Sequence, residues 1–344
     1  MSKKKVNVGG LLLGDGKIYI QSMLNIPAED VEGSVRQAHE LEEAGCEIIR
    51  AAIPTLDDVR LIPALKKAVN IPVVADIHFD YRIALAAVEA GVDKVRINPG
   101  NIGGVDRVKA VADACKLHNV PIRIGVNSGS LERRLLEKYG SPTPEALVES
   151  ALGHVKLLND CDFDDIVISI KSSDVKLMIA AYRLLAQQVD YPLHLGVTEA
   201  GTERMGIIKS AVGIGSLLCD GIGDTIRVSL TADPVKEIYA AKDILRACDI
   251  GTGVQIVACP TCGRTKIALI PLAEQVEKLC AGINKPIKVA VMGCVVNGPG
   301  EAREADIGIA GGNGEGILFK KGKILRKVPE DKLLEELKKE IDLL

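Results

Sequence analysis

The stretch that decides the fold is PVVADIHFDYRIALAAVEAGVDKVRIN, residues 72–98. It opens on an apolar run, Pro72–His78, that is typical of a buried strand. Tyr81–Ala90 then carries apolar residues at helical spacing and ends before Gly91, a common helix terminator. A second strand-like run, Lys94–Asn98, follows. The stretch therefore predicts one strand–helix–strand unit of a parallel sheet.

The same unit recurs through residues 1–250, and eight such units predict a (β/α)8 TIM barrel. The expected strands are Ile18–Met23, Glu47–Ile53, Pro72–His78, Lys94–Asn98, Pro121–Asn127, Asp165–Lys171, Leu193–Glu199 and Thr225–Leu230. A doubly wound sheet is the less favoured alternative, because no Gly-x-Gly-x-x-Gly follows the first strand. Ser128–Pro144 is expected to form an extended loop that could serve as a lid.

A domain boundary is expected at Asp249–Gly253, which follows the eighth helix and is rich in glycine. Residues 251–344 then predict a small α+β domain of two strands, a helix, a glycine-rich hairpin and a charged final helix. The expected segments are Val254–Ala258, Ile267–Cys280, Lys288–Met292, Ile307–Leu325 and Glu330–Leu344.

The composition narrows the class of protein. The chain has 344 residues and a formal net charge of −3, which gives no bulk attraction to nucleic acid or to an anionic membrane. Without a signal peptide or an apolar membrane span, the expected location is the cytoplasm. Nine cysteines suit a reducing compartment better than a disulfide framework. Six of them are expected to be small buried apolar residues: Cys46, Cys115, Cys161, Cys219, Cys248 and Cys280.

Polar residues gather at the predicted carboxyl ends of the barrel strands, where TIM barrels carry their chemistry. They are Gln21, Ser22, Asn25, Arg50, Asp76, His78, Arg96, Asn98, Arg123, Asn127, Ser169, Lys171, Glu199, Arg227 and Ser229. Five of these are cations from different strands, and their convergence favours a substrate with a diphosphate or more than one phosphate. Each cation could instead pair with a neighbouring carboxylate. Asp76 and Glu199 are candidate acids or bases, whereas His78 is more typical of a structural hydrogen-bonding residue.

A pair of cysteine motifs marks the smaller domain. Cys259-Pro-Thr-Cys262-Gly-Arg is followed by Gly-Cys294-Val-Val-Asn-Gly-Pro-Gly-Glu301. Three thiols on glycine-rich turns can hold one soft metal centre, and no fourth cysteine or histidine follows at zinc spacing. An iron–sulfur cluster is favoured over zinc or no metal. Glu301 is the nearest candidate for a fourth ligand.

These motifs resemble those of the 4-hydroxy-3-methylbut-2-enyl diphosphate synthases, in their compact bacterial two-domain form. Ile20-Gln-Ser-Met23, Val74-Ala-Asp-Ile-His78 and Val95-Arg-Ile-Asn98 extend the resemblance. It implies an oxidoreductase of isoprenoid precursor synthesis that opens and dehydroxylates 2-C-methyl-D-erythritol 2,4-cyclodiphosphate with two electrons from ferredoxin or flavodoxin.

The resemblance also implies particular site residues. A [4Fe–4S] cluster would be held by Cys259, Cys262, Cys294 and Glu301. Phosphate and substrate contacts would come from Arg50, Arg96, Arg123, Asn127, Lys171, Arg227 and Ser229. Further polar positions of the active site would be Asp76, His78, Asn98, Thr198 and Glu199.

The chain path predicts how the two parts cooperate. The eighth helix leads away from the barrel mouth, so the smaller domain starts at the opposite end of its own barrel. A head-to-tail homodimer, in which each cluster serves the other subunit's mouth, satisfies both copies. Glu199 is the expected proton donor, with Asp76 and His78 as further catalytic residues. The alternatives are a metal-stabilised TIM-barrel phosphate-ester lyase or pterin-synthase-like enzyme without redox chemistry, and a non-catalytic electron carrier.

Overall fold

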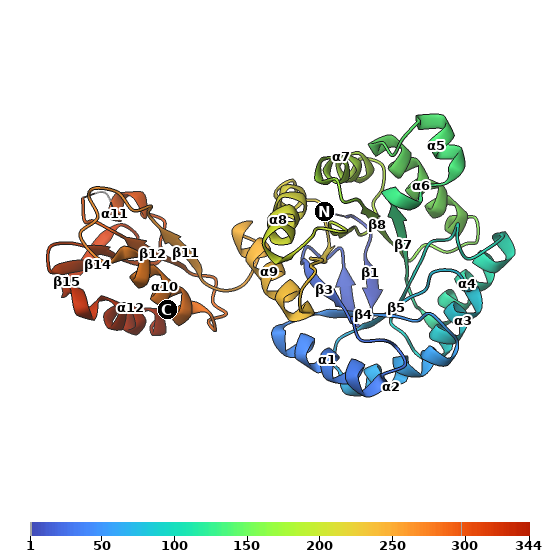
Figure 1. The fold of residues 1–344 in the computed structure, drawn as a ribbon, viewed down its shortest axis with the longest axis horizontal. Coiled ribbons are helices and arrows are strands. Elements are labelled where there is room, and N and C mark those ends of the chain that lie inside the picture. Colours follow the sequence, from blue (N-terminus) through green and yellow to red (C-terminus); the bar gives the residue numbers. More distant parts are fainter. Residues whose placement is uncertain (1, 297) are drawn as a thin grey trace. The chain divides into compact units, whose positions relative to one another are not determined.

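The structure is a computed structural model, and it describes residues 2–296 and 298–344. The chain forms two compact units, Met1–Cys248 and Asp249–Leu344. Figure 1 shows the first unit as a ring of helices around a central sheet, and the second as a smaller sheet with its own helices.

An eight-stranded parallel sheet forms the core of the first unit. In chain order its strands are β3 (Tyr19–Met23), β4 (Ile48–Ala52), β5 (Val73–Asp76), β6 (Lys94–Ile97), β7 (Ile122–Asn127), β8 (Ile166–Lys171), β9 (His194–Leu195) and β10 (Thr225–Ile226). Their spatial order is β8-β7-β6-β5-β4-β3-β10-β9. A bridge between Ile168 and Leu193 joins the two outer strands and closes the ring. The predicted TIM barrel is therefore confirmed.

Helices cover the outside of this ring. They are α1 (Val31–Ala44), α2 (Leu61–Ala68) after the short helix η1 (Asp57–Arg60), α3 (Tyr81–Glu89), α4 (Val105–His118), α5 (Arg133–Tyr139), α6 (Pro144–Asn159), α7 (Val175–Ala186), α8 (Glu203–Cys219) and α9 (Pro234–Ala247). Local signals set their ends. Asp30 caps α1 by accepting a hydrogen bond from the Gly33 amide, and Gly45 ends that helix with a left-handed φ of 96°.

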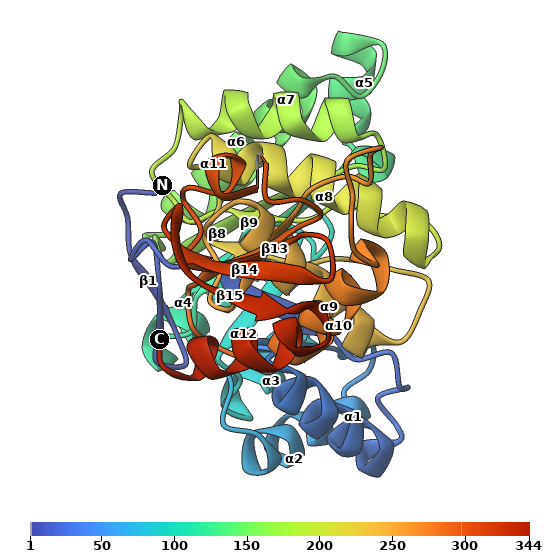
Figure 2. The ribbon, with the colours of Figure 1, turned by 90° about the vertical axis from the view of Figure 1, so that its left-hand side faces the viewer.

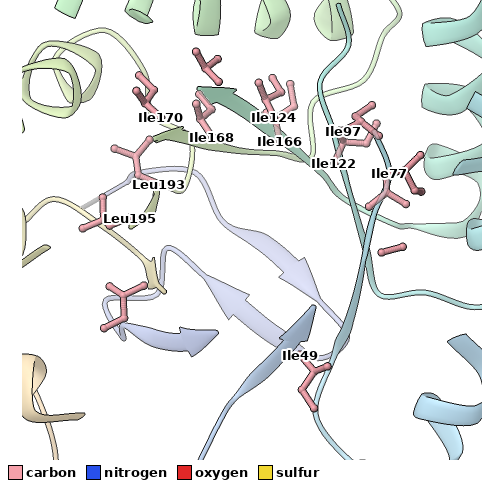
Figure 3. Packing of buried hydrophobic residues seen from close by; sticks show 14 of the residues in the cluster. Ile49, Ile77, Ile97, Ile122, Ile124, Ile166, Ile168, Ile170, Leu193 and Leu195 are labelled. Carbon is pink, nitrogen blue, oxygen red and sulfur yellow. The ribbon is translucent and has the colours of Figure 1, made fainter. Parts of the chain in front are cut away.

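The alternation of side chains along each strand separates two layers. Ile49, Ile77, Ile97, Ile168 and other aliphatic residues pack with the helices in one large core (Figure 3). The residues between them face the barrel interior. At its amino-terminal end the hairpin β1 (Val6–Val8)–β2 (Leu11–Leu13) packs on an apolar layer formed by Tyr19, Ile48, Val74 and Val167. Polar residues therefore occupy the interior toward the opposite end.

The second unit contains a five-stranded sheet. Its strands, in spatial and chain order, are β11 (Gln255–Ala258), β12 (Lys288–Met292), β13 (Ile307–Gly311), β14 (Glu315–Lys320) and β15 (Lys323–Pro329). The first three are parallel and the last two antiparallel. Helices α10 (Leu269–Cys280) and α12 (Leu333–Asp342) share one apolar core with the sheet, and α12 begins after the short helix η3 (Glu330–Lys332) (Figure 2). The four-residue helix α11 (Gly298–Glu301) precedes β13.

Several sequence expectations are wrong in detail. Residues 128–144 do not form one long loop. They contain η2 (Ser128–Ser130) and α5, whose Leu135 is buried beside α6. Arg133 and Arg134, at the start of that helix, are exposed, whereas Glu132 precedes it and accepts a hydrogen bond of 2.8 Å from Ser150. Cys219 is exposed and Cys248 only partly buried, because each lies where a helix ends, α8 and α9 respectively. Strands β9 and β10 have two residues each, so the expected strands Leu193–Glu199 and Thr225–Leu230 are too long.

Candidate functional site at the mouth of the barrel

A cavity of about 310 Å³ opens at the carboxyl ends of the barrel strands. Most of the expected site residues line it: Arg50, His78, Arg96, Asn98, Arg123, Asn127, Lys171, Thr198 and Arg227. They come from β4, β6, β7 and β8 and from the segments that follow β5, β6, β9 and β10. The parallel strands thus bring residues from across 178 positions of sequence, from 50 to 227, into one polar hollow.

Asp76 lies beneath this cavity and holds two of its cations. Its carboxylate accepts hydrogen bonds from Arg50 and, at 3.1 Å, from Arg96. Burial raises the pKa of Asp76, but the two guanidinium groups outweigh burial and hold it well below its usual range. Asp76 is therefore ionised, and both of its oxygens are engaged. Such a carboxylate orients the arginines and is a poor proton donor.

Gly125 on β7 makes this arrangement possible. A side chain at this position would place its Cβ 2.5 Å from the Nε and Nη2 atoms of Arg96. Only glycine leaves that volume free, because the contact is shorter than van der Waals packing permits. The need for glycine at this position comes from Arg96 on the neighbouring strand β6.

Positive charge dominates the rest of the cavity. Arg123 is fully buried, and its Nη1 donates only a long hydrogen bond of 3.4 Å to Gln21. Burial and the neighbouring cations, Arg227 foremost, lower the pKa of Lys171 well below its usual value. The cavity has five cations, whereas Asp76 and Glu237 are the carboxylates in ion-pair range of them among residues 2–296 and 298–344. This excess of charge favours an anionic ligand.

Seven of the polar residues expected at the mouth do not line the cavity: Gln21, Ser22, Asn25, Asp76, Ser169, Glu199 and Ser229. Among them, Asp76 lies behind the cavity. Glu199 is exposed and has a left-handed φ of 51°, an uncommon conformation for a residue with a side chain. It follows β9 by four positions, so the expectation that it ends a strand is wrong. His78 is half exposed at the cavity, 3.7 Å from Asp76.

Three residues in the cavity wall and three groups beneath it were missed. Phe79, Asn101 and Ser130 line the cavity, and Lys94, His194 and Glu237 are buried near its charged residues. Lys94 had a signal in the sequence, because it lies two positions before Arg96 and so shares its inward face. Glu237 had none, because it belongs to helix α9.

Lys94 is a candidate for stabilising substitution. It is fully buried, and no acceptor in the described part of the chain contacts its Nζ. Burial, followed by Arg123 and Arg50, lowers its pKa well below the usual value. We expect Lys94→Met to raise the free energy of unfolding at neutral pH by about 1–3 kcal/mol, because an unpaired buried polar group is removed.

The pH dependence of that gain follows from linkage. A lysine with a lowered folded pKa makes the unfolded state bind more protons, so wild-type stability rises with pH up to about 10.4, the ordinary lysine pKa. The gap between Lys94→Met and wild type should therefore narrow from pH 7 to pH 10 in denaturant titrations. Lys67→Met, at an exposed position of α2, is the control and should change stability by less than about 0.5 kcal/mol. A loss of stability in Lys94→Met contradicts this account.

In the second unit, two turns bring the cysteine motifs together. The Gly293 amide donates a hydrogen bond of 3.1 Å to Cys259 Sγ, and the Lys266 amide donates one of 3.0 Å to the Gly293 carbonyl. Cys294 lines a hollow of about 270 Å³ together with Gly263 and Arg264, which follow Cys262. The three thiols are thus carried by turns that touch each other.

The donor set suits a soft metal centre. All three cysteines are free thiols, and hydrogen bonds from the backbone and side chain of Arg264 lower the pKa of Cys262, which favours its thiolate. No trio of His, Cys, Asp or Glu side chains within residues 2–296 and 298–344 is arranged to hold a single ion. An iron–sulfur cluster is therefore favoured by the three free thiols and their spacing in the sequence. Asn297, within the second motif, lies outside the described residues.

The fold and the cationic mouth define the class of protein: a TIM-barrel enzyme with an appended cysteine-bearing domain. Family models match both parts, the "GcpE TIM-barrel domain" over residues 3–242 and the "GcpE protein C-terminal domain" over residues 255–343. The chain belongs to the GcpE family.

Relatives cover nearly the whole chain. A protein of Clostridium perfringens named 4-hydroxy-3-methylbut-2-en-1-yl diphosphate synthase (flavodoxin) is 60% identical over 341 residues, which is 98% of each chain. A protein of Listeria monocytogenes serotype 4b with the same name is 57% identical and covers 99% of this chain and 93% of its own. The resemblance inferred from the motifs is therefore confirmed.

Solved structures agree on the barrel. Dihydropteroate synthase from Stenotrophomonas maltophilia matches 71% of this chain and 97% of its own at a TM-score of 0.53 and 14% identity. DAHP synthase from Thermotoga maritima matches 72% of each chain at a TM-score of 0.51 and 14% identity. At such identity the likeness extends to the fold alone. Separately, no helix in the described ranges has both the length and the apolar character needed to cross a bilayer.

Proposed function

We propose that this chain catalyses the reductive ring opening and dehydroxylation of 2-C-methyl-D-erythritol 2,4-cyclodiphosphate to 4-hydroxy-3-methylbut-2-enyl diphosphate. The relatives are named for synthesis of this product. The observation that carries the proposal is the excess of buried positive charge at the barrel mouth, where five cations line one cavity of about 310 Å³. A cyclic diphosphate supplies the negative charge that such a site requires.

The cavity suggests a division of work. Arg50, Arg96, Arg123, Lys171 and Arg227 bind the diphosphate. The neutral side chains Asn98, Asn127 and Thr198 of the cavity wall donate to or accept from the remaining oxygens of the substrate. Ser229 does not line the cavity, and we propose it as a further contact on the family resemblance alone. Asp76 fixes two of the arginines through its hydrogen bonds, and we assign it this role rather than proton transfer. His78, at the cavity wall, is close enough to the surface to meet the substrate directly.

Cys259, Cys262, Cys294 and Glu301 are the residues we propose to hold a [4Fe–4S] cluster. When bound, the cluster would supply two electrons one at a time and, with a carboxylate in place of a fourth thiolate, an exchangeable iron position. The apposition of the two cysteine turns supports this assignment. Flavodoxin, the donor in the relatives' names, is the proposed electron source, with ferredoxin as the alternative.

Anaerobic purification followed by iron and sulfide analysis tests the proposal most directly. About four irons and four sulfides per chain are expected, together with turnover of the cyclic diphosphate by reduced flavodoxin. Zinc in place of iron, with no visible absorbance, would instead favour a phosphate-ester lyase or a pterin-synthase-like enzyme. A cluster without turnover would favour an electron carrier.

The path of the chain supports the proposal of a head-to-tail homodimer. Helix α9 starts after the mouth segment 227–230 and has 14 residues, so it carries the chain about 21 Å along the barrel. The second unit begins at Asp249, directly after this helix. We propose that each cysteine-bearing unit serves the mouth of the partner subunit.

Glu199 remains the proposed proton donor. Glu199→Gln is expected to lower kcat by about 100-fold or more, because general acid catalysis commonly contributes 10²–10⁴-fold. Iron content and the visible spectrum should not change, since Glu199 is not among the proposed ligands. The measurement is steady-state turnover of the cluster-loaded enzyme, with the exposed Glu203→Gln as control. A near-normal kcat in Glu199→Gln would remove this residue from the mechanism.

A further inference from the structure

The segment after β10 carries two of the proposed substrate contacts but has little support from the sheet. Strand β10 ends at Ile226, one residue before Arg227 and three before Ser229. The Arg227 amide still donates to the Leu195 carbonyl at 2.9 Å. Beyond Arg227 the ladder stops, so other contacts must fix residues 228–230.

Glu237 supplies those contacts. Its Oε1 accepts a hydrogen bond of 2.9 Å from the Leu230 amide, and its Oε2 accepts one of 3.3 Å from Ser22 Oγ. The same Oε2 lies 3.8 Å from Arg227 Nε. One carboxylate thus touches both ends of the 227–230 segment and the strand β3 beside it.

The helix that carries Glu237 is well placed to hold it still. Asp233 caps α9 by accepting a hydrogen bond from the Val235 amide, and Pro234 occupies the first turn. Glu237 is 4% exposed in this first turn, and α9 packs beside β3. Because α9 holds the buried Glu237 carboxylate in one position, this carboxylate can fix the position of the 227–230 segment that it binds.

We propose that Glu237 is a positioning residue, which holds Arg227 and the 227–230 segment in the geometry that binds the substrate's diphosphate. This inference rests on the proposed function, because it takes Arg227 and Ser229 as substrate contacts. Glu237 itself does not line the cavity. Its effect on catalysis therefore passes through Arg227 and the backbone at Leu230.

Burial shifts the pKa values of both Glu237 and Arg227, and each charge opposes the shift of the other. Burial raises the pKa of Glu237, while Arg227 and the Leu230 amide oppose that shift. Burial likewise lowers the pKa of Arg227, and Glu237 opposes it. Each charge thus makes the other tolerable, and removing the carboxylate leaves Arg227 without its compensating partner.

Glu237→Gln is the direct test, because it keeps the shape and removes the charge. We expect kcat/KM for the cyclic diphosphate to fall about 10- to 100-fold, since an ångström of misplacement can cost about 100-fold. Iron content should be unchanged. Glu203→Gln is the matched control: its carboxylate pairs at 2.6 Å with Lys236, next to Glu237, but lies on the surface. It should retain wild-type kinetics.

Binding of inorganic pyrophosphate, measured by calorimetry, gives a readout that does not depend on turnover. Glu237→Gln should weaken pyrophosphate binding by about the same factor as it lowers kcat/KM. Ser22→Ala removes the hydroxyl that donates a hydrogen bond to the Glu237 carboxylate, and it should weaken pyrophosphate binding by a smaller factor. If the wild type binds pyrophosphate but does not turn over the cyclic diphosphate, the proposed function fails, and a weakened affinity in Glu237→Gln still supports the positioning role of Glu237. Unchanged pyrophosphate affinity in a folded Glu237→Gln overturns the role of Glu237.

A double-mutant cycle separates positioning from a general structural effect. If Glu237 acts mainly through Arg227, then the loss of pyrophosphate affinity in Arg227→Met combined with Glu237→Gln should be clearly smaller than the sum of the two single losses. Losses that simply add would show that Glu237 acts independently of Arg227 and would overturn the proposal. If Glu237→Gln is unstable, Ser22→Ala can replace it in the cycle with Arg227→Met, and additive losses of pyrophosphate affinity would again overturn the proposal.

Discussion

Asp76→Asn is expected to lower the free energy of unfolding by about 3–5 kcal/mol, the usual cost of removing one partner from a buried ion pair. Asp76 is 1% exposed and bonds both Arg50 and Arg96. The asparagine keeps the shape but leaves two buried guanidinium groups facing each other without a counter-charge. Their displacement should also reduce turnover of the cyclic diphosphate by about 100-fold.

The effect depends on pH in a definite direction. The folded pKa of Asp76 is depressed, so its stabilisation is fully present above the ordinary aspartate pKa of about 3.9 and is lost as the pH falls toward the folded value. The stability gap between wild type and Asp76→Asn should be constant from pH 5 to 8 and shrink below about pH 4.

Denaturant titrations at several pH values measure this gap. Asp113→Asn makes the same chemical change in an exposed pair with Lys109 and should cost less than about 0.5 kcal/mol. A loss in Asp76→Asn as small as that of the control would mean that the buried network contributes little to stability.

Cys294→Ser is expected to abolish turnover and most of the bound iron, because a serine hydroxyl is a far poorer ligand for iron than a thiolate. Iron analysis and the visible spectrum of the anaerobically purified variant measure the loss. Cys219→Ser, which changes an exposed thiol of the barrel unit, should retain the iron of the wild type. Full iron content in Cys294→Ser would exclude this residue as a ligand.

Mixing this variant with a barrel variant tests whether two subunits share each site. Arg123→Met removes a fully buried cation from the cavity and should be inactive on its own. If subunits exchange freely, half of the dimers are mixed, and each mixed dimer has one site built from intact parts. About a quarter of wild-type activity should therefore return. No recovery after demonstrated subunit exchange would place each site within a single chain.

The fold was largely predictable, because it depends on patterns that repeat locally. Strand β12 has the expected bounds, and helix α3 begins at the expected Tyr81 and ends one residue before the expected Ala90, since apolar patterning and Gly91 mark them in the sequence. The two shortest strands, β9 and β10, were overestimated. Their apolar and polar residues alternate as in a strand, but the neighbouring ladder ends after two residues. Ladder length is a property of two strands, and one strand's sequence does not contain it.

The site was predictable to the extent that it follows strand polarity. Arg50, Arg96, Arg123 and Lys171 could be assigned to one cavity because parallel strands end at the same edge of a barrel. The role of Asp76 could not be predicted, because an inward-facing aspartate can equally be a proton donor or a residue that orients neighbouring side chains. Only its two arginine neighbours decide the question.

The sequence by itself determined that this chain is a TIM barrel with a cationic mouth and a separate cysteine-bearing domain. Those properties follow from residue type, spacing and chain order, which can be taken directly from the sequence. The tertiary structure alone decided that Asp76 orients two arginines, that Lys94 is buried without an acceptor in the described chain, and that Glu237 of α9 braces the segment after β10. These roles depend on distances between residues far apart in sequence, and such distances exist only once the barrel has closed.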